Sequence, residues 1–141
     1  GGATVLMASG EPLPDQVKCI VSDCAYTSVK DILTYQLKSM YKLPAFPLIP
    51  ITSLICRMKA GYFFGEASAL TQVSRSKLPI LFIHGDEDKF VPYDMVHRLY
   101  EAAGSEKELL TVPNAQHGNA YFADKEGYGN KLSSFVSRYV V

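Results

Sequence analysis

A continuous apolar run, Leu78-Pro79-Ile80-Leu81-Phe82-Ile83, constrains the fold of this chain more than any other segment. An uninterrupted apolar run of this length is typical of a strand that is buried on both faces. Such strands occur in parallel sheets, because the crossover connections between parallel strands place helices on both sides of the sheet. The run therefore predicts an α/β protein.

Two further segments, 17–22 and 108–112, are rich in residues that favour strands. Apolar residues at helical spacing predict three helices, over 29–40, 92–103 and 128–140. Ser28 and Asp31 resemble a capping box at the start of the first of them. Strands that alternate with helices predict right-handed crossovers and one parallel sheet with helices on both faces.

The remaining segments fit one domain, or part of one, over 1–141. Residues 1–10 are small and apolar and predict a short helix. Residues 43–66 form an apolar excursion, in which three prolines predict an irregular connection over 43–54 instead of a regular helix or strand. The excursion is cap-like, and its proline-rich part over 43–54 suits a substrate-facing cap and core packing equally well. Residues 78–141 carry the strands, loops and helices that complete the fold.

The composition excludes several classes of protein. The chain has 14 Lys+Arg against 14 Asp+Glu and is 48% apolar, which is typical of a folded domain. It has no apolar stretch near the roughly 18 residues of a membrane-spanning helix, and it has no basic stripe, so we do not expect nucleic acid as a partner. Three cysteines fit neither a disulfide framework nor paired metal-binding motifs. Cysteine usage and the lack of a leader lead us to expect a cytoplasmic protein.

Polar residues follow two of the predicted strands at the edge of the sheet where open α/β proteins bind ligands. Asp86, Glu87 and Asp88 follow the central apolar strand, and His117 follows the next strand. A carboxylate and an imidazole at adjacent strand ends are the pair that activates a nucleophile. The acid fixes the imidazole tautomer, and the imidazole removes the proton of the attacking group.

Two loops resemble those of a known superfamily, the α/β-hydrolases. The segment His84-Gly85-Asp86-Glu87-Asp88-Lys89-Phe90-Val91-Pro92 resembles their acid loop, in the pattern H-G-x-x-D-x-x-V-P. The segment Pro113-Asn114-Ala115-Gln116-His117-Gly118 resembles their histidine loop. The resemblance covers essentially the whole chain and is strongest to the serine esterase and peptidase-like branch. It implies that Asp88 is the triad acid and His117 the base, in the chain order of this fold.

The segment Gly1-Gly2-Ala3-Thr4 resembles the second half of the nucleophile elbow G-x-S-x-G, which implies a serine upstream of this chain. If Gly1 closes the motif, the serine lies two residues upstream, and we favour this register. If Gly2 closes it, the serine immediately precedes Gly1, whose N–H then serves the oxyanion hole. Ser9 and Cys24 lack the glycines of the elbow pattern, two residues before and two residues after the nucleophile, and are not expected to replace the serine. The chain then resembles the C-terminal part of such a fold, inactive by itself.

The resemblance implies hydrolysis of a carboxylic ester, or of a small amide or peptide, by a Ser-Asp-His triad without a metal or organic cofactor. The expected partners are this substrate, the missing N-terminal half of the same fold, and a second copy. The second copy would bind through the sheet edge that the missing strands leave bare. Tyr121 and Phe122, which follow His117 closely, are candidate substrate-binding residues.

Two other functions fit parts of the sequence. Asp86 and Asp88 form an Asp-x-Asp after an apolar strand, which suggests a phosphoryl-transfer site with a metal. The intervening His84-Gly85 disfavours that site, as does the lack of further strand-end carboxylates beyond Asp23. Asp86 is instead expected to bond the backbone of its own loop, and His84 to be a structural hydrogen bonder. A non-catalytic binding or oligomerisation module remains an alternative, because no nucleophile is found in this chain.

Overall fold

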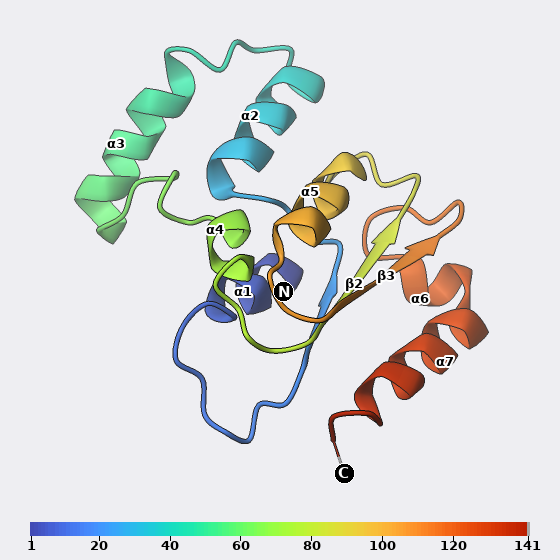
Figure 1. Cartoon of the computed structure of the whole chain (residues 1–141). Coiled ribbons are helices and arrows are strands. Elements are labelled where there is room, and N and C mark those ends of the chain that lie inside the picture. The colour runs from blue at the N-terminus through green and yellow to red at the C-terminus, as the bar shows by residue number, and fades with distance from the viewer. Residues whose placement is uncertain (141) are drawn as a thin grey trace.

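The computed structural model describes residues 1–140 and contains a parallel sheet with the strand order β1-β2-β3 (Figure 1). The strands are β1 (Ile20–Asp23), β2 (Ile80–Gly85) and β3 (Lys107–Val112). In the register of the sheet, Ile80 lies between Ile20 of β1 and Lys107 of β3. The predicted parallel α/β fold is therefore confirmed. Val141, the last residue of the predicted domain, lies outside the described residues.

Helices cover both faces of the sheet, as predicted. On one face, α1 (Gly2–Ala8), α4 (Ala69–Val73) and α5 (Asp94–Ala102) form a core with Ile80 and Phe82. On the other face, α6 (Ala120–Ala123) and α7 (Lys125–Val136) pack against Leu81 and Ile83. Because successive side chains of β2 enter different cores, the whole strand is buried, which explains its uninterrupted apolar sequence.

The first predicted strand is displaced along the chain. The structure begins β1 at Ile20 because the N–H of Val17 donates to the Pro14 carbonyl oxygen in a turn. The last helix is also shorter than predicted: α7 ends at Val136, although Tyr139 still packs on the same core. The short helices α4 and α6 were not predicted, because elements of so few residues show no helical period. The predicted helix over 92–103 is α5, which begins at Asp94.

Helix α2 (Val29–Ser39) begins where the capping residues predict. The Ser28 hydroxyl accepts the N–H of Asp31 at 3.0 Å. The Asp31 carboxylate accepts the hydroxyl hydrogen of Thr27 at 2.6 Å instead of completing the reciprocal capping box. Ile32 is buried on the inner side of this helix, where it packs near Val91 and Met95.

The predicted irregular connection over 43–54 is wrong from residue 48 onward. The structure has a regular helix there, α3 (Leu48–Ala60). Pro50 is the third residue of this helix, and the first N–H groups of a helix have no intrahelical acceptor, so a proline costs little at that position. Gly61, with φ of 85°, ends the helix in a left-handed conformation. Figure 1 shows α3 beside α2 and away from the sheet.

Within residues 1–140, every helix falls short of the length and hydrophobicity that crossing a bilayer requires.

Candidate active site

Asp88 lies in the loop after β2, and its side chain is fully buried. Its Oδ1 atom accepts the backbone N–H groups of Phe90 at 2.9 Å and Val91 at 2.8 Å. Aspartate commonly bonds the backbone a few residues ahead in this way, which stabilises the loop locally. These two bonds fix the carboxylate and leave Oδ2 for other partners.

His117 lies in the loop after β3, and its Nδ1 atom is 2.7 Å from Asp88 Oδ2. Because an ionised carboxylate only accepts hydrogen bonds, Nδ1 carries the proton of the neutral ring. The Nε2 atom then has the free lone pair that a general base needs. Asn114 and Gly118, at φ of 57° and 68°, give the loop its sharp turns, since asparagine and glycine tolerate the left-handed region best.

The pKa of the Asp88 carboxyl lies below its ordinary value. Burial raises this pKa, but hydrogen bonds from His84, from the Val91 N–H and from His117 lower it by more. His84 Nε2 is 3.0 Å from the Val91 carbonyl oxygen and 3.4 Å from Asp88 Oδ2. Both oxygens only accept, so Nε2 carries a proton and His84 supports the carboxylate as a structural hydrogen bonder. Asp88 is therefore ionised at neutral pH.

The acid loop and the histidine loop are bonded directly to each other. Asp86 Oδ1 accepts the N–H of Asn114 at 2.7 Å, so the prediction that Asp86 bonds its own loop is wrong. The N–H of Glu87 donates to the Ala115 carbonyl oxygen at 3.2 Å. A Cβ atom on Gly85 would lie 2.1 Å from the same oxygen, so the two loops approach this closely only with glycine there.

A hollow of about 380 Å³ lies beside His117. The start of α1 forms one wall of it, with Gly1 and Gly2. A Cβ atom on Gly2 would lie 2.2 Å from the Asp23 carbonyl oxygen, so the glycine lets α1 approach the end of β1. The structure thus brings Gly1, Gly2 and His117 around one hollow. The other lining residues are Ala3, Thr4, Asp23, Cys24, Tyr26, Ile32, Gln36, Phe90 and Val91.

Sequence reasoning did not assign Cys24 and Phe90 to the site. Cys24 Sγ accepts the N–H of Gly118 at 3.3 Å and donates to Asp23 Oδ1 at 3.0 Å, so it links the ends of β1 and the histidine loop. Its backbone has φ of 47°, a strained conformation for cysteine that often marks functional sites. The Phe90 ring lies 4.9 Å from the His117 ring, centroid to centroid. Phe90 lies within the acid-loop motif over 84–92, and this position was the sequence feature that could have predicted its place in the site.

The candidate substrate-binding residues Tyr121 and Phe122 are not among the residues that line this hollow. The Tyr121 ring packs edge-on against Tyr128 at 5.6 Å, and Phe122 is 67% exposed. Contact of either residue with a substrate stays a prediction.

Cys24, Asp88 and His117 also form the one group of metal-ligand type found in the described part of the chain. One ligand atom from each lies within 4.8 Å of the others. Zinc binds cysteine as the thiolate. Burial and the neighbouring Asp23 carboxylate raise the pKa of the Cys24 thiol to about 12, so this sulfur is protonated at neutral pH. Asp88 and His117 also contact each other at 2.7 Å, an arrangement that serves proton transfer by His117.

The chain matches the family described as "Serine aminopeptidase, S33" over residues 20–125 and belongs to that family. The matched segment contains all three strands and both loops that hold Asp88 and His117. The family and the solved structures below confirm the predicted α/β-hydrolase superfamily.

Curated relatives cover almost all of this chain and are much longer. The chain is 29% identical over 136 residues to the uncharacterized protein YqkD of Bacillus subtilis, which covers 96% of this chain and 45% of YqkD. It is 26% identical over 140 residues to the uncharacterized protein YfhR of Escherichia coli, which covers 96% of this chain and 42% of YfhR. The chain therefore spans less than half the length of these relatives.

Solved structures of two hydrolases share the fold. The Pyrococcus furiosus esterase Pf2001 superposes with a TM-score of 0.71 at 19% identity, covering 100% of this chain and 52% of the esterase. A Pyrococcus horikoshii acylaminoacyl peptidase superposes with a TM-score of 0.68 at 17% identity, covering 99% of this chain and 22% of the peptidase. At these identities the likeness establishes the fold alone.

Proposed function

We propose that the complete protein is a serine hydrolase in which Asp88 and His117 are the acid and the base of a Ser-His-Asp triad. The observation that carries the proposal is the 2.7 Å contact between the buried Asp88 carboxylate and His117 Nδ1, next to a hollow that Gly1 and Gly2 help to line. The nucleophile is a serine that immediately precedes Gly1 or lies two residues before it.

In the acylation step, His117 Nε2 accepts the proton of the serine hydroxyl as the serine oxygen attacks the substrate carbonyl carbon. Backbone N–H groups at the start of α1 stabilise the negative oxygen of the tetrahedral intermediate, because helix N-termini carry free N–H groups. Asp88 stabilises the imidazolium that forms. His117 then protonates the leaving alcohol or amine, and an acyl-serine remains.

In the deacylation step, His117 removes a proton from water as the water oxygen attacks the acyl carbon. Collapse of the second tetrahedral intermediate releases the carboxylic acid, and His117 returns the proton to the serine. Each cycle consumes one water, and its protons and electrons balance without a metal or an organic cofactor.

The proposed substrate is a carboxylic ester, with a small amide or peptide as the second class. The hollow is lined mainly by apolar and small side chains, and its most polar lining residues are Asp23, Gln36 and His117. An uncharged acyl group suits such a lining. The names of the structural neighbours, an esterase and an acylaminoacyl peptidase, support both classes.

The test is labelling of the complete protein with a fluorophosphonate, followed by peptide mapping. We expect one adduct, on a serine immediately before Gly1 or two residues before it, which also fixes the register of the elbow. His117→Ala should abolish labelling and lower kcat for a soluble p-nitrophenyl ester by about 10⁶-fold. His97→Ala is the matched control, because His97 lies in α5 against Tyr93 and should leave both readouts unchanged.

Two results would contradict the proposal. An adduct that persists in folded His117→Ala removes His117 from the mechanism. A folded protein without any adduct or esterase activity supports a non-catalytic binding module instead.

A further inference from the structure

Helix α3 presents an apolar face to the outside of the molecule. Ile51, Leu54, Ile55 and Met58 follow the spacing i, i+3, i+4, i+7, which places them on one side of the helix. Their exposed fractions are 52%, 53%, 42% and 72%. In an ordinary surface helix this apolar stripe faces the core. Here the inward residue is Ile49, so the apolar stripe of α3 lies on the opposite side from the core.

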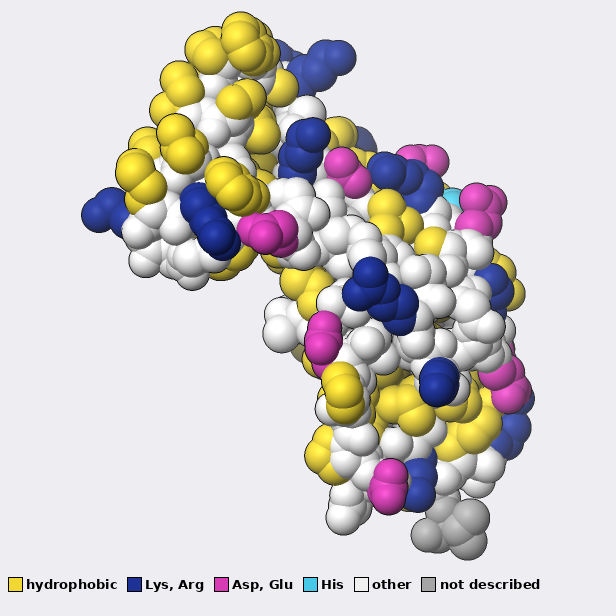
Figure 2. Space-filling view, turned by 60° about the vertical axis from the view of Figure 1, so that its left-hand side comes forward, with side chains coloured by type: hydrophobic (Ala, Val, Ile, Leu, Met, Phe, Trp, Pro, Cys, Tyr) yellow, Lys and Arg dark blue, Asp and Glu magenta, His cyan; other side chains and the backbone are white. Residues whose placement is uncertain are grey.

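The exposed apolar surface continues on either side of α3, and we define residues 40–63 as the apolar arm. Ten of the 15 exposed large apolar side chains among the described residues belong to it: Met40, Tyr41, Leu43, Phe46, Ile51, Leu54, Ile55, Met58, Tyr62 and Phe63. Figure 2 shows hydrophobic side chains gathered on the lobe that α2 and α3 form. A contiguous patch of this kind marks an interaction surface.

Basic side chains surround the apolar arm. Residues 29–65 contain five Lys and Arg against one acidic residue, Asp31, whereas the whole chain has 14 of each sign. Asp31 is already paired with Arg98, and Glu66, the next acidic residue along the chain, lies 4.0 Å from Arg57. Lys38, Lys42 and Lys59 are exposed, and none of them makes an ion pair with another residue of the described chain. The arm is thus an apolar surface with a positively charged border.

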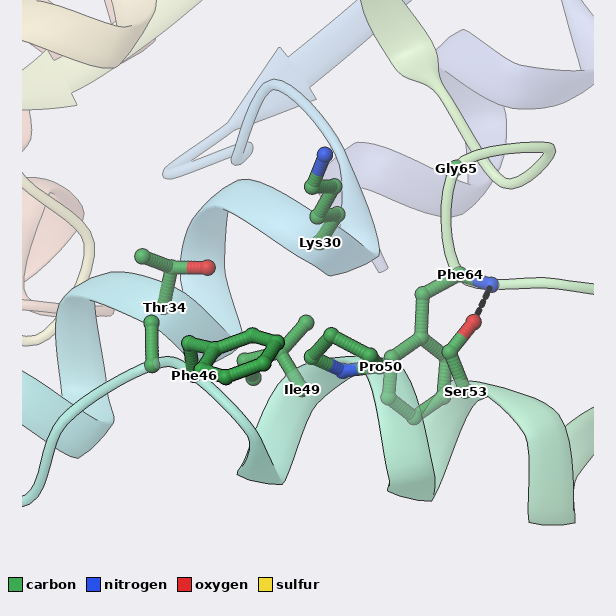
Figure 3. Close-up of a pocket in the computed structure, with 9 residues that line it drawn as sticks. Lys30, Thr34, Phe46, Ile49, Pro50, Ser53, Phe64 and Gly65 are labelled. Carbon is green, nitrogen blue, oxygen red and sulfur yellow. Dashed lines mark hydrogen bonds between the residues drawn. The ribbon is translucent and has the colours of Figure 1, made fainter.

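A pocket of about 450 Å³ lies between α2 and α3, beneath the arm. Figure 3 shows Phe46, Ile49 and Phe64 around it, and the N–H of Phe64 donates to the Ser53 hydroxyl at 3.0 Å. Helix α2 separates this pocket from the hollow beside His117. Lys30 and Thr34 line the pocket, whereas Ile32 and Gln36 line the hollow. The pocket beneath the arm and the candidate active site therefore lie on opposite sides of α2.

We propose that the apolar arm docks the protein on an anionic phospholipid surface. The side chains of Leu54 and Met58 enter the boundary between headgroups and acyl chains, and Lys42 and Lys59 contact the phosphate groups. The positive charge of the arm favours an anionic lipid surface over a second copy of the chain. If two arms packed face to face, the lysines around one arm would lie against the lysines around the other and repel them. The proposal extends beyond the hydrolysis of an ester and does not depend on it.

The test is co-sedimentation of the complete protein with vesicles of phosphatidylcholine alone or mixed with phosphatidylglycerol. We expect binding to the mixed vesicles that weakens as salt is raised. Lys42→Gln should lower the partition coefficient about fivefold, and the double variant Leu54→Asp with Met58→Asp should lower it more than tenfold. Both changes are on exposed side chains, so the fold and the hydrolysis of a soluble ester should be unchanged.

Matched controls are Lys18→Gln and Val140→Asp, which alter exposed side chains far from the arm in sequence and should bind vesicles like the parent. Absence of binding to the mixed vesicles overturns the proposal. The proposal is also overturned if the control variants lose as much vesicle binding as the variants of the arm. If sedimentation velocity shows that the double variant converts a dimer to a monomer while vesicle binding is absent, the arm is an interface between copies instead.

Discussion

At the scale of single residues, one buried carboxylate organises the candidate site. Asp88 uses Oδ1 to hold its own loop and Oδ2 to contact His117 and His84. The H-G-x-x-D-x-x-V-P motif predicts the acid, and its last positions supply the Val91 N–H bond and the Val91 carbonyl that orients His84. The contribution of Cys24 could not be predicted, because its bond to Gly118 joins residues 94 positions apart.

Replacing Asp88 should show whether this carboxylate, and not another carboxylate of the same loop, takes part in catalysis. We expect Asp88→Asn in the complete protein to lower kcat for a soluble ester by about 10⁴-fold, because an amide no longer selects the catalytic tautomer of His117. Glu87→Gln changes an exposed carboxylate in the same loop and should leave the rate unchanged. Equal rates for the two variants would remove Asp88 from the proposed triad.

Asp88 should also stabilise the fold in a pH-dependent way, because the pKa of its carboxyl is lower in the folded protein than in the unfolded chain. Above the ordinary value of 3.8 the full contribution is present. As the pH falls from there through the lower folded-state pKa, the folded protein takes up a proton and the contribution disappears.

Urea unfolding of the parent and of Asp88→Asn measures this effect. The difference in the free energy of unfolding should be constant from about pH 7 to about pH 5 and should shrink below about pH 4. A difference that grows on acidification would contradict the direction of the pKa change.

At the scale of elements, the contact between two strand ends decides whether the site exists. Gly85 ends β2, and the Ala115 carbonyl oxygen lies 2.1 Å from the position that a Cβ atom on Gly85 would take. The sequence shows that the acid-loop motif has a glycine at position 85, but the requirement for glycine comes from the histidine loop, whose backbone at Ala115 leaves no room for a side chain. The same holds for α3, whose prolines predict an irregular segment until the position of Pro50 in the first turn is known.

Gly85→Ala should push the acid and histidine loops apart. We expect a loss of about 1–3 kcal/mol in the free energy of unfolding, the usual cost of an overpacked site, together with a fall in esterase rate. Gly129→Ala is the matched control, because nothing lies within 4 Å of its Cβ position in α7 and alanine favours a helix. Denaturant unfolding checks both variants, and a Gly85→Ala protein as stable as the parent would contradict the close contact.

At the scale of the whole molecule, the sheet of the described residues ends at β1 on one side and β3 on the other. A strand edge without a partner recruits another strand. We therefore expect the isolated 141-residue polypeptide to self-associate through the edge of β1, while the complete protein does not use that edge.

Sedimentation velocity of the isolated polypeptide over a range of concentrations checks this expectation. The double variant Leu54→Asp with Met58→Asp should still associate, since it changes the apolar arm and leaves β1 intact. If this variant is a monomer, the parent associates through the apolar arm. If the parent itself is a monomer at all concentrations, neither the edge of β1 nor the apolar arm mediates self-association.

The sequence by itself determined the sheet and the two site loops. The apolar run over 78–83 is buried on both faces only as a central strand between helices, so it determines the sheet. The acid-loop motif contains residues that bond one another over three or four positions, such as Asp88 with Val91 and His84, so it determines the local structure of that loop. The tertiary structure decided everything that depends on contacts between distant segments. Examples are the Asp86 bond to Asn114, the Cys24 bond to Gly118, the fit of Gly85 against Ala115, and the outward apolar face of α3. Such contacts have no local signal, because their energy comes from packing between elements and not from neighbouring residues in the chain.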